Sequence, residues 1–506
     1  MTIIPIIVRH SGKKYTVDLN TDESGEVFKF QLYSLTGVDP DRQKILIKGG
    51  QLRDDTDLNS LGLKPNQVLM MLGTAGELPK EPVTKMTFIE DMTDKQLAET
   101  TKTPNGILNL GNTCYLNSTL QCLRIMPELA SQLNEFQRPP RQQFSQTADP
   151  VAVTESLSEL YQSINSQTTT FNPNKFLMFF RIAFPQFAQR GEEGYKQQDA
   201  EEAFSQILNA VDISMKSVNP SVPSFVQKYM TGTYTTTMTC AESDIEPVVH
   251  STDNFLKLDC HITGQTNFLH QGLLASLSET IEKHSDVLGR NAQFTLKKQI
   301  SRLPKYLTVH FMRFYWRRDT NMKAKILRKV AFPFELDVTD MCEPEYKSRL
   351  VTVRDKVREV RKLKQDKARA ANRARTQLDS AKDDSSSSTE IARLQAEAVA
   401  AVSPAELADN GACVTGLYEL IGVLSHKGKS ADSGHYQFWS KQAESDVETG
   451  PGPQAAVGTT TQVQEPKWWQ FNDDKVTLVD QTKIEAMAGG GESDSALILL
   501  YRAIPL

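Results

Sequence analysis

A cysteine at the start of a predicted helix is the strongest candidate for a reactive group in this chain. It is Cys114, within GILNLGNTCYLNSTLQCL at residues 106–123. The residues after it place leucines at helical spacing: Leu116, Leu120 and Leu123. Asn112 or Thr113 is the expected cap, and the unpaired N–H groups of a first helical turn favour a thiolate. Cys114 is therefore a candidate nucleophile; the alternative is an unreactive buried cysteine.

A histidine in a second segment is the candidate base for that thiol. A cysteine nucleophile needs a group that takes its proton, and that group needs an orienting partner. In GLYELIGVLSHKGKSADSGHYQFW, residues 416–439, His435 opens a predicted strand after a polar loop. Gly434 leaves room for a substrate backbone beside the imidazole. His426, on the near side of the loop, is the weaker candidate.

A third segment offers the orienting group. In WWQFNDDKVTLV, residues 468–479, either Asn472 or Asp473 can accept the second imidazole N–H, although FNDD alone predicts only a turn. Asn109 precedes the nucleophile by five positions and can donate its amide to a developing oxyanion, together with the N–H of Cys114. Loss of such a donor typically lowers the rate by about 10²–10³.

Length and composition limit the functions that are open to the chain. At 506 residues it exceeds one ordinary core, and 39% hydrophobic with 24% charged residues is typical of a globular protein. A net charge of −5 argues against a nucleic-acid binder, and no apolar run approaches the roughly 20 residues of a membrane span. The six cysteines contain no C-x-x-C pair, so we expect no metal site and no cofactor. A reducing compartment, cytoplasm or nucleus, fits this cysteine usage.

Residues 1–75 have the pattern of a small sheet that packs on one helix. TIIPIIVR and KKYTVDL predict paired strands, and residues 23–36 predict a helix with Val27, Leu32 and Leu35 facing inward. The run KILIKGGQLRDDTDLNSLGLKPNQVLMML resembles the second half of ubiquitin. Ubiquitin ends in a free Gly-Gly tail, whereas this chain continues with LGTAGELPKEP, so the unit is interpreted as a fused docking module.

The docking surface of such a module is predicted at His10, Leu46 and Met71. The alternative is that these are scattered surface side chains without a partner.

The rest of the chain predicts a linker and one large domain of mixed helix and strand. Residues 76–100 contain Pro and Glu and predict the linker, and the domain covers 101–506. An insertion at 347–410 begins with a basic stretch, 347–375, that contains 12 Lys and Arg against three Asp and Glu. This stretch is either a solvated helical excursion or a site for an acidic partner. Residues 441–466 have the composition of a disordered loop.

Three motifs in this order resemble the ubiquitin-specific protease family. They are GNTCYLNSTLQ, YKQQDAEEAF, and SGHYQFW with WWQFNDDKV. The resemblance implies an α+β fold: a β-grasp ubiquitin-like domain, then a papain-like catalytic domain with thumb, palm and β-rich fingers. It places the nucleophile on Cys114, the general base on His435 and the orienting residue on Asn472. Asp473 is also functional in many members.

The family cleaves the bond after the C-terminal glycine of ubiquitin, so the resemblance implies ubiquitin and polyubiquitinated proteins as partners. Residues at the expected tail-binding positions are Gln198, Asp199, Glu202, Gly434 and Tyr436. The alternative for residues 198–210 is a charged helix start, since acidic residues favour first turns. Many members bind zinc through two cysteine pairs, but only Cys240 and Cys260 occur in the equivalent region, which predicts no metal.

The resemblance also predicts gating by two surface loops, 312–321 and 425–434. The expected gating residues are Phe314, Tyr315, Trp316, Ser430 and Ser433. A ubiquitin-like domain ahead of the protease domain is the layout of proteasome-associated members. We therefore expect the 26S proteasome regulatory particle as a partner, an activity that rises on binding it, and a monomer when free. The alternative function is a catalytically silent ubiquitin-binding regulator, although both Cys114 and His435 are present.

Overall fold

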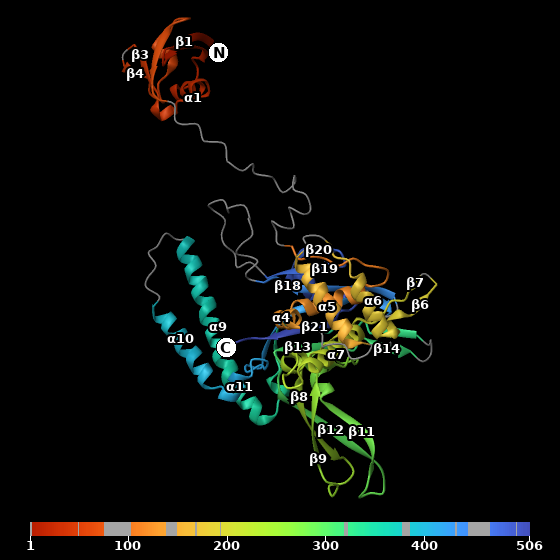
Figure 1. Cartoon of the computed structure of the whole chain (residues 1–506). Coiled ribbons are helices and arrows are strands. Elements are labelled where there is room, and N and C mark those ends of the chain that lie inside the picture. The colour runs from red at the N-terminus through yellow and green to blue at the C-terminus, as the bar shows by residue number, and fades with distance from the viewer. Residues whose placement is uncertain are drawn as a thin grey trace. The chain divides into compact units, whose positions relative to one another are not determined.

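The chain divides into two units, Met1–Asp91 and Met92–Leu506 (Figure 1). The computed structural model describes residues 3–48, 50–74, 103–137, 149–166, 170–192, 194–317, 322–376, 385–430, 433–443, 466–491 and 493–506. The predicted linker at 76–100 lies outside these ranges, as does most of the predicted loop at 441–466. Among the helices within these ranges, none combines the length and the apolar character that a membrane crossing needs.

The first unit is a sheet in the order β2-β1-β5-β3-β4 with one main helix, α1. Its elements are β1 (Ile3–His10), β2 (Lys13–Asn20), α1 (Gly25–Thr36), β3 (Lys44–Ile47), β4 (Gly50–Gln51) and β5 (Val68–Leu72). Antiparallel β1–β2 and β3–β5 pairs flank the parallel β1–β5 pair. Gly37, in the left-handed conformation, ends α1. This is the predicted β-grasp fold.

The inward face of α1 differs from the prediction in phase. Phe28 and Leu32 are fully buried, whereas Val27 and Leu35 are 39% and 49% exposed. Phe28 and Leu32 are four positions apart and therefore share one face of the helix. Since only that face packs on the sheet, Val27 and Leu35 remain in solvent.

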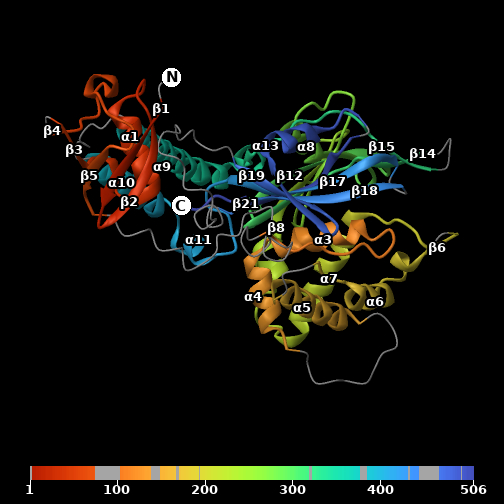
Figure 2. The same ribbon diagram turned by 90° about the horizontal axis from the view of Figure 1, so that it is seen from above.

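The second unit contains a sheet in the order β10-β13-β21-β17-β18-β19-β20, and β16 pairs with β17. Its strands are β10 (Leu258–Cys260), β13 (Tyr306–Phe311), β16 (Glu335–Asp337), β17 (Leu417–Ser430), β18 (Ser433–Lys441), β19 (Lys467–Asn472), β20 (Lys475–Asp480) and β21 (Ser495–Ala503). In Figure 2, helices gather on one side of it: α3 (Cys114–Arg124), α4 (Pro127–Glu135), α5 (Pro150–Ser166), α6 (Asn174–Ala183) and α7 (Ala200–Val218). The continuous apolar run of β21 is buried throughout Ala496–Tyr501, as expected of a strand covered on both faces.

A separate antiparallel sheet, in the order β11-β12-β8-β9, extends away from this core (Figure 1). Its strands are β8 (Gly232–Cys240), β9 (Val249–Phe255), β11 (Ser278–Ser285) and β12 (Arg290–Arg302). The remaining elements are short: β6 (Arg190–Gly191), β7 (Gly194–Tyr195), α8 (Leu269–Ser276), β14 (Phe314–Arg317), β15 (Met322–Lys325), α11 (Pro404–Ala408) and α13 (Gln481–Glu485). The α+β architecture matches the prediction.

The basic insertion forms two helices that pack on each other, α9 (Pro344–Thr376) and α10 (Ser385–Ala400). Its apolar stripe attaches it to the sheet, because Val353 and Val357 are buried with Leu417 of β17. Val360 packs instead against Ile391 of α10 and its neighbours. The helical spacing of the three valines is thus confirmed.

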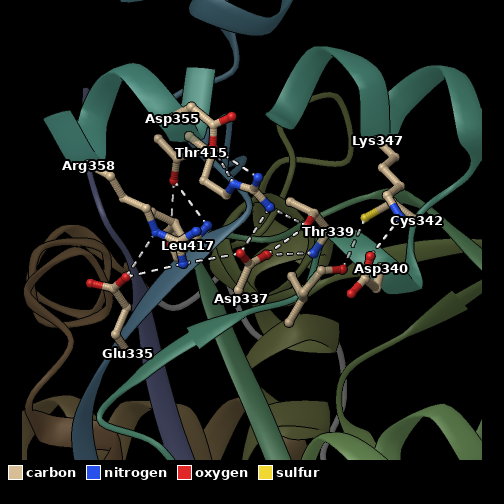
Figure 3. Close-up of polar contacts among 12 residues, drawn as sticks. Glu335, Asp337, Thr339, Asp340, Cys342, Lys347, Asp355, Arg358, Thr415 and Leu417 are labelled. Atoms are coloured by element: carbon tan, nitrogen blue, oxygen red, sulfur yellow. Dashed lines mark hydrogen bonds and ion pairs between the residues drawn. The ribbon is translucent and has the colours of Figure 1, made fainter. Parts of the chain in front are cut away.

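Charged side chains of α9 pair with carboxylates of the same unit (Figure 3). Asp337 of β16 forms ion pairs with both Arg354 and Arg358 at 3.1 Å. Glu335 of the same strand forms ion pairs with Arg358 and Arg361. These arginines are therefore neutralised within the chain rather than left for a partner.

The two ends of the insertion attach to one short segment. Isolated bridges pair Cys342 with Ile300 and Ala412 with Pro304. The insertion therefore leaves and rejoins the domain at neighbouring points.

We predict that Asp337→Ala weakens the attachment of α9. Asp337 also accepts hydrogen bonds from the N–H and hydroxyl of Thr339, at 3.1 and 2.7 Å. Loss of these bonds with the arginine pairs should lower the free energy of unfolding by about 1–2 kcal/mol, measured by urea denaturation. The matched control is Asp355→Ala, which removes an exposed partner of Arg354 and should change it by less than about 0.5 kcal/mol. Equal effects of the two variants would contradict the prediction.

Candidate active site

Cys114 is the first residue of α3, and Thr113 occupies the cap position. The helix buries its apolar face in the core, which leaves Cys114 only 3% exposed. Thr113 makes no side-chain cap. Its hydroxyl accepts from the N–H of Leu110 at 2.9 Å and donates to Asn109 Oδ1 at 3.2 Å. The N–H of Cys114 has no partner inside the helix, as for any first-turn residue, and is available to an oxyanion.

His435 of β18 and Cys114 are 321 positions apart in sequence, yet their side chains lie close enough for Cys114 to be the largest influence on the pKa of His435. Nε2 of His435 lies 2.6 Å from Oδ1 of Asn472, so Nε2 carries a hydrogen and Nδ1 faces the thiol. The hydrogen bond to Cys114, supported by that to Asn472, raises the pKa of His435 to about 9 against the opposing effect of burial. The raised pKa suits the imidazole to accept a proton from the thiol.

The two residues that could orient the base occupy different places. Asn472 contacts His435, whereas the nearest carboxylate oxygen of Asp473 is 3.8 Å from the same nitrogen. Asp473, at a positive φ of 52°, accepts from the amides of Asn109 and Asn117 at 3.0 and 2.8 Å. Asn472 is therefore the residue in hydrogen-bond contact with the imidazole, and Asp473 attaches this turn to the loop and helix of the cysteine.

The amide of Asn109 has a fixed orientation. Its oxygen accepts from the N–H groups of Gly111 and Thr113 at 3.0 and 3.2 Å, so its nitrogen faces Asp473. An amide nitrogen has two hydrogens, and one remains for another acceptor.

Gln197 is a site residue that the sequence analysis missed. Its Nε2 lies 3.2 Å from the sulfur of Cys114 and 3.4 Å from the carbonyl of Gly434, so it bridges the nucleophile and the strand of the base. Gln197 stands directly before Gln198 in the motif YKQQDAEEAF, and this position could have indicated a role in the site. Only Gln198, the second of the two glutamines, was predicted as a site residue.

The expected tail-binding residues are not equivalent in the structure. Asp199 caps α7 by accepting from the N–H of Glu201 at 2.9 Å, which agrees with the helix-start alternative. Gln198 and Glu202 are half-buried beside it. Tyr436 is wrong as a surface contact, because its side chain is buried in the core.

Gly434 has a structural requirement of its own. Its φ is +122°, and a Cβ there would lie 2.3 Å from the carbonyl oxygen of Lys427. No other residue fits this turn without rearrangement.

His426, the weaker candidate base, is fully buried. Burial, with repulsion from Lys325, lowers its pKa to about 3, so it remains neutral. It does not compete with His435 as the base.

The predicted gating residues are partly described. Phe314 is half-buried against the ring of His426, whereas Tyr315 and Ser433 are exposed. The side chains of Trp316 and Ser430 lie outside the described residues.

The predicted docking patch needs correction at two positions. Met71 is 2% exposed and belongs to the core of the first unit, and His10 is largely buried against the carbonyl of Met71. Leu46 is 45% exposed, and its cross-strand neighbour Met70 is 54% exposed. Side chains alternate between the two faces of a strand. The exposed methionine is therefore Met70, one position before the predicted Met71.

Within the described ranges, no three His, Cys, Asp or Glu side chains converge as metal ligands would. Cys240 and Cys260 are free thiols.

Comparisons with known families agree with the two units. The family described as Ubiquitin carboxyl-terminal hydrolase matches residues 105–501, and the Ubiquitin family matches residues 6–76.

Several curated proteins are similar over nearly their whole length. Ubiquitin carboxyl-terminal hydrolase 6 of Schizosaccharomyces pombe is 44% identical over 99% of both chains. Ubiquitin carboxyl-terminal hydrolase 7 of Arabidopsis thaliana is 37% identical over 96% of both. Ubiquitin carboxyl-terminal hydrolase 14 of Caenorhabditis elegans is 33% identical over 99% of this chain and 94% of its own. The fold is similar to that in the "Structure of the SAGA Ubp8/Sgf11/Sus1/Sgf73 DUB module bound to ubiquitin aldehyde", with a TM-score of 0.50 and 18% identity over 81% of this chain and 71% of that one.

We predict that Cys114→Ala lowers the pKa of His435 from about 9 toward the ordinary value of about 6.5. The hydrogen bond to Cys114 is the largest cause of the raised pKa, and the substitution removes it. NMR titration of the imidazole ring of His435 measures this pKa, and the signal that disappears in His435→Gln identifies the ring. The raised pKa also means that the charged imidazole stabilises the fold fully below about pH 6.5, and that this contribution is lost as the pH rises through about 9. An unchanged pKa in Cys114→Ala would refute the contact.

We predict that Asp473→Asn lowers kcat about 10²-fold while KM changes less than threefold. The amides of Asn109 and Asn117 donate hydrogen bonds to the two carboxylate oxygens of Asp473, and an asparagine offers only one accepting oxygen there. The substitution therefore disturbs Asn109 and the turn that carries Asn472. Steady-state kinetics of substrate cleavage measure kcat and KM of the variant and of the wild type. The exposed neighbour provides the control, since Asp474→Asn should leave both constants within twofold. Equal kinetics for both variants would show that Asp473 has no role.

Proposed function

The chain belongs to the ubiquitin carboxyl-terminal hydrolase family and is a cysteine-type deubiquitinase with a ubiquitin-like domain; from this premise we propose that Cys114, His435 and Asn472 perform the hydrolysis. The contact of Cys114 with His435, whose other nitrogen is bonded to Asn472, carries the proposal. It supplies a nucleophile, a base and an orienting group in one connected arrangement.

In the first step, Cys114 transfers its proton to Nδ1 of His435, and the thiolate attacks the carbonyl carbon of the C-terminal glycine of ubiquitin. The bond to the Asn472 oxygen keeps the imidazole in the tautomer that can accept this proton. The negative charge then develops on the carbonyl oxygen. The N–H of Cys114 and the amide of Asn109 stabilise it.

Collapse of this intermediate breaks the C–N bond, and the imidazolium protonates the departing amine. Ubiquitin remains attached to Cys114 as a thioester. His435 next takes a proton from water, which attacks the thioester carbonyl and releases ubiquitin with a free carboxylate. The sulfur leaves as thiolate, and return of the proton from His435 restores the thiol that began the cycle.

The tail of ubiquitin is proposed to approach between the start of α7 and the start of β18. Gln197 supports this route, since it links Cys114 to the carbonyl of Gly434. Glu202 at the start of α7 offers a carboxylate to arginines of the tail, and Asp199 holds that helix start. Loops 312–321 and 425–434 are proposed to gate this approach.

The 26S proteasome regulatory particle is the proposed partner of the ubiquitin-like domain, and binding is proposed to raise activity. The exposed apolar face at Leu46, Met70 and Leu72 supports a docking role, as does likeness to Ubiquitin carboxyl-terminal hydrolase 6 over the full length. The proposed products are trimmed substrates and recycled ubiquitin. We further propose a monomer when free, in the cytoplasm and nucleus, where reduced cysteines are expected.

The test is cleavage of ubiquitin that carries a C-terminal fluorophore, with and without purified proteasome. The wild-type protein should cleave it and should form an adduct with a ubiquitin C-terminal electrophile at Cys114. Cys114→Ala should lose both activities. Proteasome should increase the wild-type rate at least tenfold, and Leu46→Asp should reduce this increase.

The matched surface control is Val27→Asp, which introduces the same charge on the outer face of α1. It should retain the increase. Binding of ubiquitin without hydrolysis would favour a silent regulator instead, and equal activation of both variants would exclude the Leu46 face as the docking site.

A further inference from the structure

A buried lysine lies at the base of the β14–β15 hairpin. Lys325, the last residue of β15, is 7% exposed. Its ammonium donates to the carbonyl oxygen of His426 at 2.6 Å and contacts Nδ1 of the same residue at 3.1 Å. β15 thereby attaches to β17, beside which it lies in Figure 2.

This contact determines the tautomer of His426. An ammonium group can only donate, so Nδ1 of His426 accepts and Nε2 carries the hydrogen. Nε2 makes no hydrogen bond of good geometry in the described part of the chain, although a contact of the ring with the backbone of Ser433 raises its pKa against the effect of burial. Nε2 faces the start of β18, since a Cβ on Gly434 would lie 2.7 Å from it.

The ring of His426 is enclosed between two aromatic side chains. Phe314 of β14 packs edge-on, with centroids 5.3 Å apart, and Tyr436 of β18 lies at 4.6 Å. Lys427, next to His426, pairs in register with His435. The imidazole of His426 thus lies against Gly434 and Tyr436, the residues before and after His435 in the chain.

The surroundings of Lys325 are unfavourable to a cation. Burial, with repulsion from Arg313, lowers its pKa to about 8, and Asp494 opposes this change. The guanidinium of Arg313 is itself buried and donates to backbone carbonyls, including that of Ala496 at 2.8 Å. Lys427 and His435 add further positive charge near Asp494. Since burying an ammonium costs stability, a methionine here should fold at least as stably.

We infer that Lys325 is a positioning residue for the reaction: it fixes His426 against Gly434 and so holds the start of β18 in the geometry that presents His435 to Cys114. The inference rests on the proposed roles of Cys114 and His435. It assigns to the hairpin base an effect on catalysis that does not require contact with substrate.

The test compares Lys325→Met with Lys325→Arg and with Lys329→Met, an exposed lysine four positions on. Three quantities are measured: kcat and KM for the ubiquitin fluorophore substrate, Tm, and the pH midpoint of Cys114 alkylation with Cys114→Ala as background. Lys325→Met should lower kcat about tenfold, keep KM within twofold, keep or raise Tm, and raise the alkylation midpoint by about one pH unit. Lys325→Arg should restore kcat to within threefold of the wild type, because a guanidinium still donates to the same acceptors.

A second variant keeps the inference falsifiable. His426→Leu should lower kcat as Lys325→Met does, and the double variant should lose no more than either single variant. Wild-type kinetics for Lys325→Met overturn the inference, as does a fall in Tm that parallels the fall in kcat or full additivity in the double variant. If the wild type also lacks Cys114-dependent cleavage, the proposed function itself fails; if it cleaves normally, only the role of Lys325 is rejected.

Discussion

The carboxylate of Asp473 is the constraint on which the rest of the site depends. It accepts from Asn117 on α3 across 356 positions of sequence, and from Asn109 in the loop ahead of the nucleophile. The backbone reinforces this junction, because the carbonyl of Asp473 accepts from the N–H of Ile107 at 2.9 Å. A Cβ on Gly106 would lie 2.4 Å from the carbonyl oxygen of Asp474, so only glycine permits the approach. Cysteine loop and strand turn thus form one rigid body.

Two successive residues divide the support of the histidine. Asn472 gives a short neutral contact that sets direction, and Asp473 supplies a negative charge at 3.8 Å. A carboxylate in direct contact would stabilise the imidazolium more strongly, but here the charge is committed to two amides. Orientation and charge are therefore separable in this site, which is unusual for an arrangement described by three residues.

Motifs in the sequence predicted which candidate residues lie together better than they predicted which side chains are exposed on the surface. Cys114, His435 and Asn472 belong to motifs whose order and composition are specific, and they meet in space. Met71 was misplaced because strand alternation turns it inward, and composition alone does not reveal which face a strand presents. Gln197 was missed because neighbouring glutamines are indistinguishable until the backbone direction at the start of α7 is known. The contacts of Lys325 and Asp473 depend on long-range packing, which local pattern does not encode.

The ion pairs of the insertion could not be predicted from the sequence for the same reason, because they depend on long-range packing. The carboxylates that neutralise the arginines of α9 come from β16, not from the helix itself. The two bridges at its roots have a wider consequence. Cys342 and Ala412 attach at Ile300 and Pro304, four positions apart on one segment. The outer parts of α9 and α10, beyond the residues that pack on β17, can therefore change in length while both attachment points stay in place. This segment is therefore a natural graft point, at which evolution or engineering can add a new module to the enzyme while its catalytic geometry stays intact.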